Sequence, residues 1–275
     1  MEALSGRASG FLVGEVMAYP EEKLTMLKAM QKEAVEYAKA MGLTVEELTD
    51  PELSAFGIAF DRQFVLQMPE REIVSMYQRH QKEILLGAMI AKAQMRANVE
   101  GQMPGSGRVG GPVPIRACFL GVGDDWEDAA PFSTGAPANW IHAGTSLLGG
   151  TAGEPVRIGQ NAVFVVFGVG SLHPSPKIES IQFTIDGKTK PVIITGWSQK
   201  TSGLRVNEFD KAMIWKKGTT VLAKVFISAA YGSSADDYPY LIGAAYILEP
   251  ALRILDAHEF CGTDAAREVY KVVEI

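Results

Sequence analysis

Apolar side chains recur at helical spacing over the first hundred residues. Residues 20–42 begin with Pro and two acids, which suit the first turn of a helix, and end with a Gly that can stop it. A capping-box pattern at 44–47 and an Asp-Pro-Glu start at 50–52 predict short helices or turns. The longest predicted helix spans 69–98, a length of about 45 Å. Its apolar seam consists of Ile73, Tyr77, Ile84, Ala88, Ala91 and Met95.

The composition changes abruptly after this helix. Residues 101–114 contain five Gly and three Pro, which support neither a helix nor a central strand. We therefore expect a linker or an extended arm.

Beyond the linker the hydrophobic period becomes that of strands. Residues 161–169 form a β-branched and aromatic run that predicts a buried strand. Residues 181–185 alternate between apolar and polar side chains. Asp186-Gly187 then supplies a two-residue turn, and 191–197 form the return strand of a hairpin.

Further strands follow at short intervals. A second hairpin is predicted to join 212–215 to 220–227 through a turn at 216–218. Two more strands are expected at 204–207 and 240–248. The end of the chain predicts a short helix at 264–268 and a strand at 269–273.

Six or more short strands without useful helices between them indicate an antiparallel sandwich. The predicted fold is mainly β with an α-helical N-terminal arm, and its β-sandwich is jelly-roll-like. We expect the helical arm over 1–100, a Gly/Pro-rich hinge over 101–116 and the sandwich over 117–275.

Composition and charge exclude several protein classes. The 275 residues are 47% hydrophobic and 21% charged, which excludes wholesale disorder. The net charge of −6 is spread evenly along the chain, so no basic tail is available to condense nucleic acid. The longest charge-free window, 129–153, holds too many Pro and Gly for a membrane helix, and the start of the chain is not a secretory signal. We expect no membrane partner.

The cysteine count excludes a disulfide scaffold. The chain has only Cys118 and Cys261, far apart in sequence. The expectation is two buried or reduced thiols in a chain folded inside a cell.

No motif marks an active site. Residues 105–110 have the spacing of a dinucleotide-binding loop, but Gly and Pro flank them where a strand and a helix are needed. Residues 187–189 resemble the end of a phosphate-binding loop, yet they lie in the predicted hairpin turn. The stretches 144–148 and 232–236 lack the pattern of a nucleophile elbow.

Cysteine and histidine leave one formal route to catalysis. Either cysteine could pair in space with one of the four histidines, and His258 and Cys261 have a ligand-like spacing for zinc. Two ligands do not make a metal site. The four histidines are His80, His142, His173 and His258. We expect no enzyme, and no catalytic, cofactor or metal residues.

Acidic and aromatic residues suggest binding alternatives. Asp124, Asp125, Glu127 and Asp128 form a dense acidic loop that could hold Ca²⁺ or remain solvated, and Asp236-Asp237 is similar. The aromatic residues could form a sugar-stacking platform or belong to the core. These aromatic residues are Trp126, Trp140, Trp197, Trp215, Tyr231, Tyr238 and Tyr240.

The distal part of the long helix is locally basic. Four cations stand there against Glu83 alone: Arg79, Lys82, Lys92 and Arg96. This 79–96 face is either a solvated surface or a weak contact with packaged nucleic acid.

A helical arm, a Gly/Pro hinge and a C-terminal sandwich of short strands together resemble viral coat proteins built on a single jelly roll. The nearest local features are the stretch 175–183, which leads into the Asp186-Gly187 hairpin, and the apolar strand 241–248. Many coat proteins of small single-stranded viruses carry an Arg-rich arm, whereas residues 1–19 here contain only Arg7. The resemblance therefore implies a shell filled by other means, such as motor-driven packaging.

The expected function is that of a self-assembling major capsid subunit, made in the host cytoplasm and located in the virion. Homo-oligomer contacts are expected through the N-terminal helices and the sandwich edges. Methionines cluster in the arm, either as a helical core or as a surface that repacks between copies: Met26, Met30, Met41, Met76, Met89, Met95 and Met103. Deleting residues 1–100 is expected to leave a soluble sandwich. The alternative is a carbohydrate- or ligand-binding sandwich module.

Overall fold

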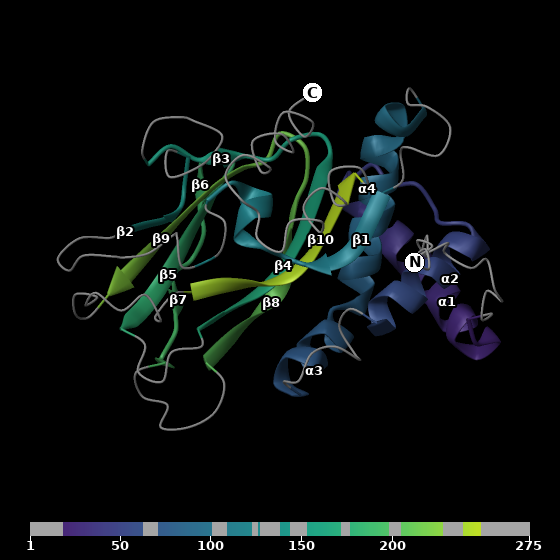
Figure 1. Cartoon of the computed structure of the whole chain (residues 1–275), viewed down its shortest axis with the longest axis horizontal. Helices are drawn as coiled ribbons and strands as arrows, with labels where there is room; N and C mark the ends of the chain where they lie inside the picture. Colours follow the sequence, from purple (N-terminus) through teal and green to yellow (C-terminus); the bar gives the residue numbers. More distant parts are fainter. Residues whose placement is uncertain are drawn as a thin grey trace, which may run out of the picture.

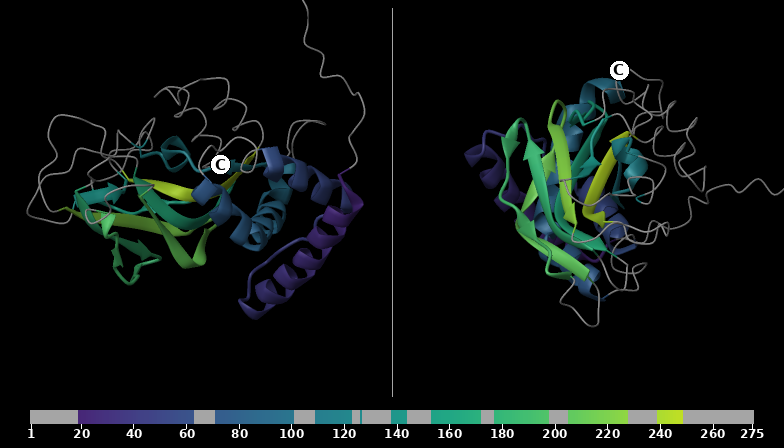
Figure 2. Two further views of the ribbon diagram at one scale, coloured as in Figure 1. Left: turned by 90° about the horizontal axis from the view of Figure 1, so that it is seen from below. Right: turned by 90° about the vertical axis from the view of Figure 1, so that its left-hand side faces the viewer.

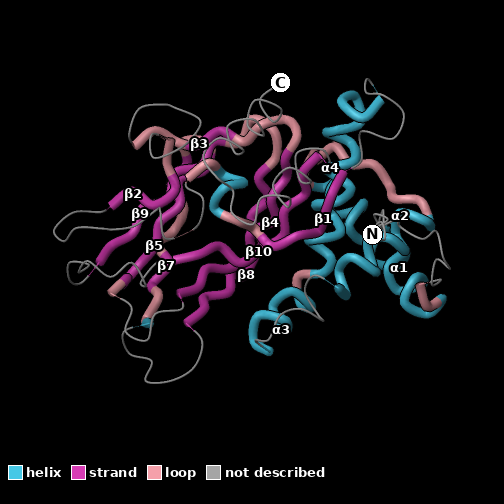
Figure 3. Tube along the Cα trace, in the orientation of Figure 1, coloured by secondary structure: helices cyan, strands magenta, loops and turns pink. Residues whose placement is uncertain are grey.

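The structure is a computed structural model of the whole chain. The residues that it describes are 19–62, 71–100, 109–122, 126, 138–143, 153–171, 177–197, 205–227 and 239–248. Three layers follow one another along the long axis, namely a sheet, a second sheet and a group of helices (Figure 1). Helices and strands occupy separate halves of the molecule (Figure 3).

The helical layer contains four α-helices: α1 (Glu21–Ala40), α2 (Asp50–Phe60), α3 (Arg71–Arg79) and α4 (Gln81–Glu100). The predicted start of α1 is confirmed, with Pro20 at the N-cap and two acids in the first turn. Gly42, with φ of 65°, follows the end of α1 as predicted.

The capping box lies at α2 and not at 44–47. The Thr49 backbone N–H donates to Glu52 Oε2 at 2.6 Å, whereas residues 43–49 form no helix. Both stretches match the pattern Thr-x-x-Glu, but only the later one precedes an apolar run that can bury a helical face. Leu53, Phe56 and Phe60 provide that face in α2.

The single helix predicted over 69–98 is instead two helices, α3 and α4, that meet at His80. Its apolar seam is buried apart from the partly exposed Ile73. The seam continues through residue 80, so the pattern alone cannot reveal the break. Side chains at this junction bind Glu208 of a distant strand, which holds α3 at an angle to α4 (Figure 1).

All strand pairs are antiparallel. One sheet, called sheet A, has the order β1-β10-β4-β8, and the other, called sheet B, has the order β2-β9-β5-β6. Sheet A consists of β1 (Val109–Pro114), β10 (Pro239–Leu248), β4 (Ala162–Ser171) and β8 (Arg205–Trp215). Sheet B consists of β2 (Ala138–Ile141), β9 (Thr220–Ile227), β5 (Ile178–Ile185) and β6 (Lys188–Thr189). Two short strands are added to sheet B, β3 (Val156–Arg157) beside β9 and β7 (Ile193–Ile194) beside β5. A short 3₁₀ turn, η2 (Ala117–Leu120), follows β1.

The antiparallel β-sandwich is therefore confirmed, but both faces of sheet A are covered. Along β4, Phe164 and Val166 point into the core between the sheets, whereas Val163, Val165 and Phe167 pack against the helices. This double burial explains why β4 is a continuous apolar run and not an alternating one. The helical residues form a third layer on the sandwich, with α1 outermost (Figure 2).

The predicted linker contributes a strand. Residues 109–114 form β1 at the edge of sheet A, paired with β10, while 101–108 lie outside the described residues. Pro lacks a backbone donor and is tolerated at a sheet edge, so Pro-rich composition does not exclude an edge strand. Gly111 has φ of 120°, and a Cβ there would lie 2.5 Å from the Ala245 carbonyl oxygen. The glycine that suggested a linker thus permits close pairing.

The turn of the first predicted hairpin is confirmed, but its return strand, expected over 191–197, is instead the two short strands β6 and β7. The second predicted hairpin is wrong. Asp186 and Gly187, with φ of 51° and 71°, form the turn between β5 and β6. Residues 204–207 and 212–215 were expected as separate strands, whereas 205–215 are the single strand β8. β8 pairs with β4, and β9 pairs with β2 and β5, so the turn at 216–218 crosses between sheets. The residues of a turn indicate that the chain reverses direction, but they do not determine which sheet the following strand joins.

The strands predicted at 161–169 and 240–248 are confirmed as β4 and β10. The expected helix at 264–268 and strand at 269–273 lie outside the described residues.

Candidate functional site

The residues considered for catalysis do not come together. Cys118 is buried in η2 and is disulfide-bonded, so the expectation of a reduced thiol is wrong and this sulfur is no free nucleophile. His142 is buried, and its Nδ1 lies 2.6 Å from the Ala143 carbonyl oxygen and 3.1 Å from the Gly153 nitrogen. Cys261, His173 and His258 lie outside the described residues. Over the described ranges no group of three or more His, Cys, Asp or Glu residues could hold a metal ion.

The glycine motifs have backbone roles in the described part of the chain. Val109 and Gly110, the end of the dinucleotide-like pattern, begin β1, so no helix N-terminus follows the motif. Gly187 belongs to the β5–β6 turn, and a Cβ there would meet nothing within 4 Å. The acidic loop residues at 124, 125, 127 and 128, the pair at 236–237, and the stretches 144–148 and 232–236 lie outside the described residues.

The tryptophans form core and not an exposed platform. Trp140, Trp197 and Trp215 are each 0% exposed, inside the core between the sheets. Trp126 is partly buried, with its ring centroid 5.9 Å from that of Trp140. Tyr240 lies in β10, and Tyr231 and Tyr238 lie outside the described residues. Fully buried indoles cannot stack on a sugar ring.

The cations of the basic helix face are paired with carboxylates of the same chain. Arg79 forms an ion pair with Glu208, and Lys82 with Glu33 at 3.3 Å. Nothing is described for the side chain of Arg96. The local excess of positive charge seen in sequence is thus balanced by residues from other elements.

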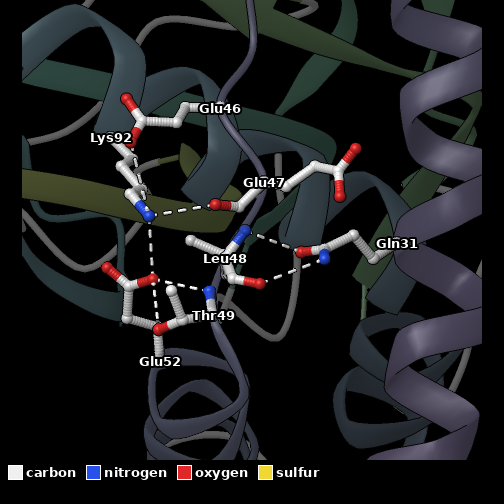
Figure 4. Close-up of polar contacts among 7 residues, drawn as sticks. All are labelled: Gln31, Glu46, Glu47, Leu48, Thr49, Glu52 and Lys92. Carbon is white, nitrogen blue, oxygen red and sulfur yellow. Dashed lines mark hydrogen bonds and ion pairs between the residues drawn. The ribbon is translucent and has the colours of Figure 1, made fainter.

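The third described cation of this face, Lys92, holds the connection between α1 and α2 (Figure 4). Its Nζ donates to Glu52 Oε2 at 2.8 Å and to the Glu47 carbonyl at 2.9 Å, and it lies 3.5 Å from Glu46 Oε1. Gln31 of α1 binds both the N–H and the carbonyl of Leu48, at 2.9 and 3.1 Å. Burial tends to raise the pKa of Glu52, but hydrogen bonds from Lys92 and Thr49 leave it below the usual value.

A second polar cluster joins the α3–α4 junction to β8. His80 is 7% exposed, and its ring stacks on Phe167 with centroids 4.6 Å apart. His80 Nε2 lies 3.1 Å from Glu208 Oε1, and Nδ1 lies 3.8 Å from Glu83 Oε2. The hydrogen bond from Arg79 lowers the pKa of Glu208, and that from His80 lowers the pKa of Glu83. The sequence draws attention to the basic residues of this cluster but not to Glu208, because Glu208 lies 128 positions after His80 and no motif links them.

Two surfaces of the described residues carry exposed large apolar side chains. On α1 these are Met26, Tyr37 and Met41, which are 49%, 44% and 60% exposed. On the edge segment of sheet B that contains β6 and β7 they are Val192 and Ile194, 45% and 78% exposed. Both surfaces are suited to contact with another molecule.

Over the described residues, no helix has the length and apolar character needed to span a membrane. Comparison of the chain with family models, curated proteins and solved structures found no match.

Proposed function

We propose that this protein is a self-assembling structural subunit and that the assembly is a virus shell of which it is the major capsid protein. The observation that carries the proposal is the order of the strands. Within the described residues the main path of each sheet has four strands, eight in all, and β3 and β7, which are two residues long like β6, lie off these paths.

The pairing of these strands is nested from the outside inwards. The first strand pairs with the last (β1 with β10), the second with the seventh (β2 with β9), the third with the sixth (β4 with β8) and the fourth with the fifth (β5 with β6). A long hairpin wrapped into two facing sheets has this pairing, and it is the arrangement of a jelly roll. It supports the jelly-roll form of the sandwich.

Jelly rolls occur in virus shells and also in sugar-binding proteins. The burial of Trp140, Trp197 and Trp215 favours the first of these classes, because a sugar platform needs exposed rings. The two exposed apolar surfaces favour it as well, since a shell subunit must contact several neighbours.

The disulfide at Cys118 fits a virion better than a protein that stays in the cytoplasm. Disulfides persist in oxidising surroundings, including the surfaces of virions, and are rare in the reducing cytoplasm. A subunit made in the host cytoplasm would therefore acquire this bond after leaving it.

Sedimentation velocity across a wide range of protein concentrations tests the proposal. The expected result is a species much larger than the 29.7 kDa chain, with a population that grows with concentration. A species of one chain at every concentration and salt, together with specific binding on a glycan screen, would support the binding module instead.

A further inference from the structure

Self-assembly needs surfaces that fit one another, and the two exposed apolar surfaces differ in chemistry. The helical patch is defined as Met26, Met30 and Tyr37 of α1 and Met41 at its C-cap, with the acids that flank it. The strand patch is defined as Lys188, Lys190, Val192 and Ile194, on the edge segment 188–194 of sheet B that contains β6 and β7.

The helical patch is a stripe along α1. Its apolar members are spaced by four, seven and four residues, which aligns them on one side of the helix. The buried side of α1 is a different set, which includes Leu27, Ala34 and Ala38. Met30 is partly buried against this core, whereas Met26, Tyr37 and Met41 are exposed. Two exposed acids, Glu22 and Glu36, flank the stripe, and neither has an ion pair within the described part of the chain.

The strand patch is formed by alternate residues of an edge. Residues 188–194 run antiparallel to β5, through pairs at Lys188 and Ile193 and a 2.8 Å hydrogen bond from the Lys190 N–H to Phe183. Residues 188–192 and 194 are all exposed, while Ile193 packs against the core. Neither lysine is ion-paired within the described ranges. The patch is therefore apolar and basic.

The two patches lie in the two outer layers of the molecule, α1 at one end of the long axis and sheet B at the other (Figure 1). One chain therefore cannot bring its own two patches together, whereas two chains can. A contact between different surfaces of identical subunits is heterologous, and it leaves one free patch at each end for the next subunit.

We infer that the helical patch of one copy binds the strand patch of a neighbouring copy, with Met26, Tyr37 and Met41 against Val192 and Ile194, and Glu22 and Glu36 facing Lys188 and Lys190. This inference rests on the proposed self-assembly and names its contact. Methionine side chains adapt to slightly different partner positions, as a contact repeated around a curved shell requires. The opposite charges select the neighbour and its orientation.

Charge reversal on the full-length protein tests the contact. The two reversed proteins are Glu22→Lys/Glu36→Lys and Lys188→Glu/Lys190→Glu, and the rescue protein carries all four changes. Lys32→Glu/Lys39→Glu is the matched control, because these exposed lysines lie on α1 away from the stripe. Light scattering gives the concentration at which half of the protein is assembled, and thermal unfolding shows that each variant is folded.

Each reversed protein is expected to need about tenfold more protein for half-assembly, a change equivalent to roughly 1.4 kcal/mol. Combining the four changes, or mixing the two reversed proteins, should restore assembly, and the control should assemble as the wild type does. Val192→Ser/Ile194→Ser should also weaken assembly, and its exposed positions leave the core intact.

Three results would overturn the inference. If the wild type assembles and both reversed proteins do so at the same concentration, the contact is elsewhere and the proposed function stands. If the reversed proteins lose assembly and the fourfold variant does not regain it, the two patches do not meet. A wild type that stays at the size of one chain at all concentrations would defeat the proposed function and this contact with it.

Discussion

Two buried tyrosines join the helical layer to the same strand. Tyr246 of β10 donates to the Ile84 carbonyl of α4, and Tyr77 of α3 donates to the Gly243 carbonyl of β10, each at 2.6 Å. Burial raises the pKa of both hydroxyls, so they remain protonated donors throughout the normal pH range. These two bonds orient the helices on sheet A, where apolar packing alone would allow sliding.

Removing either hydroxyl should weaken the fold modestly. Tyr77→Phe and Tyr246→Phe are each expected to lower the free energy of unfolding by about 1 kcal/mol, because a buried hydrogen bond is lost while the ring still fills its place. Chemical denaturation measures the change. Tyr37→Phe is the control, since its side chain is exposed on α1 and should leave the stability unchanged. An equal effect at all three positions would contradict the anchoring role.

Acid should destabilise the α3–α4 junction. The pKa values of Glu83 and Glu208 are lower in the folded chain than the usual 4.5, so the stability they contribute is present above that value. It is lost as the pH falls through the folded-state pKa values. At pH values below 4.5, the midpoint temperature of thermal unfolding should therefore decrease as the pH is lowered. The decrease per pH unit should be smaller in Glu208→Gln than in the wild type. Equal slopes for the wild type and the variant would show that Glu208 does not contribute.

Residues whose role is local are predictable from sequence, and residues with distant partners are not. Asp186-Gly187 forms its turn because the turn needs two residues at positive φ, a property of these residue types. Glu208, by contrast, follows no motif, and its meeting with Arg79 and His80 depends on how α3 crosses β8. The candidate interface is only partly predictable. Its methionines are visible in the sequence, but their exposure depends on which side of α1 the other helices cover.

At the scale of elements, the contact between α4 and sheet A depends on a helical glycine. A Cβ at Gly87 would lie 2.4 Å from Val165 Cγ2 and 2.9 Å from Tyr246 Cε2. Glycine is unfavourable within a helix, so its presence here marks a close approach.

Gly87→Ala should be destabilising despite the better helix propensity of alanine. The expected loss in the free energy of unfolding is about 1–3 kcal/mol, from forced separation of α4 and β4. Urea denaturation measures it. In a Val165→Ala background the same substitution should cost less, because the clashing methyl groups are gone. A gain in stability on Gly87→Ala alone would contradict the packing described.

Element type follows from hydrophobic period, but pairing does not. The hydrophobic patterns of β4, β5 and β10 extend over enough residues to predict these strands. The assignment of β8 and β9 to different sheets cannot be read from their patterns, because both present apolar side chains to the same core. Likewise, the buried stripe of α4 predicts a partner surface without saying that sheet A of the same chain supplies it.

At the scale of the whole molecule, the helices and the sandwich depend on each other. Apolar side chains of sheet A lie against the helices: Val163, Val165, Phe167, Val206, Ile242, Ala244, Tyr246 and Leu248. The sequence alone suggested a separable arm, and this shared core argues against it.

Deleting residues 1–100 should therefore yield an insoluble or partly unfolded protein and not a soluble sandwich. The deletion exposes one complete apolar face of sheet A, a surface that favours aggregation. Solubility after expression and binding of a hydrophobic dye report the outcome. A monodisperse truncated chain with a cooperative unfolding transition would show instead that the sandwich folds without the helical arm.

Electron microscopy of the purified full-length protein tests the account most directly. The nested strand order and the proposed contact between the two patches predict closed particles of uniform diameter, or rings of a fixed number of subunits, at physiological salt. The same particles should be absent from the Lys188→Glu/Lys190→Glu protein. A field of single particles the size of one 29.7 kDa chain, at concentrations well above those in a cell, would contradict the account.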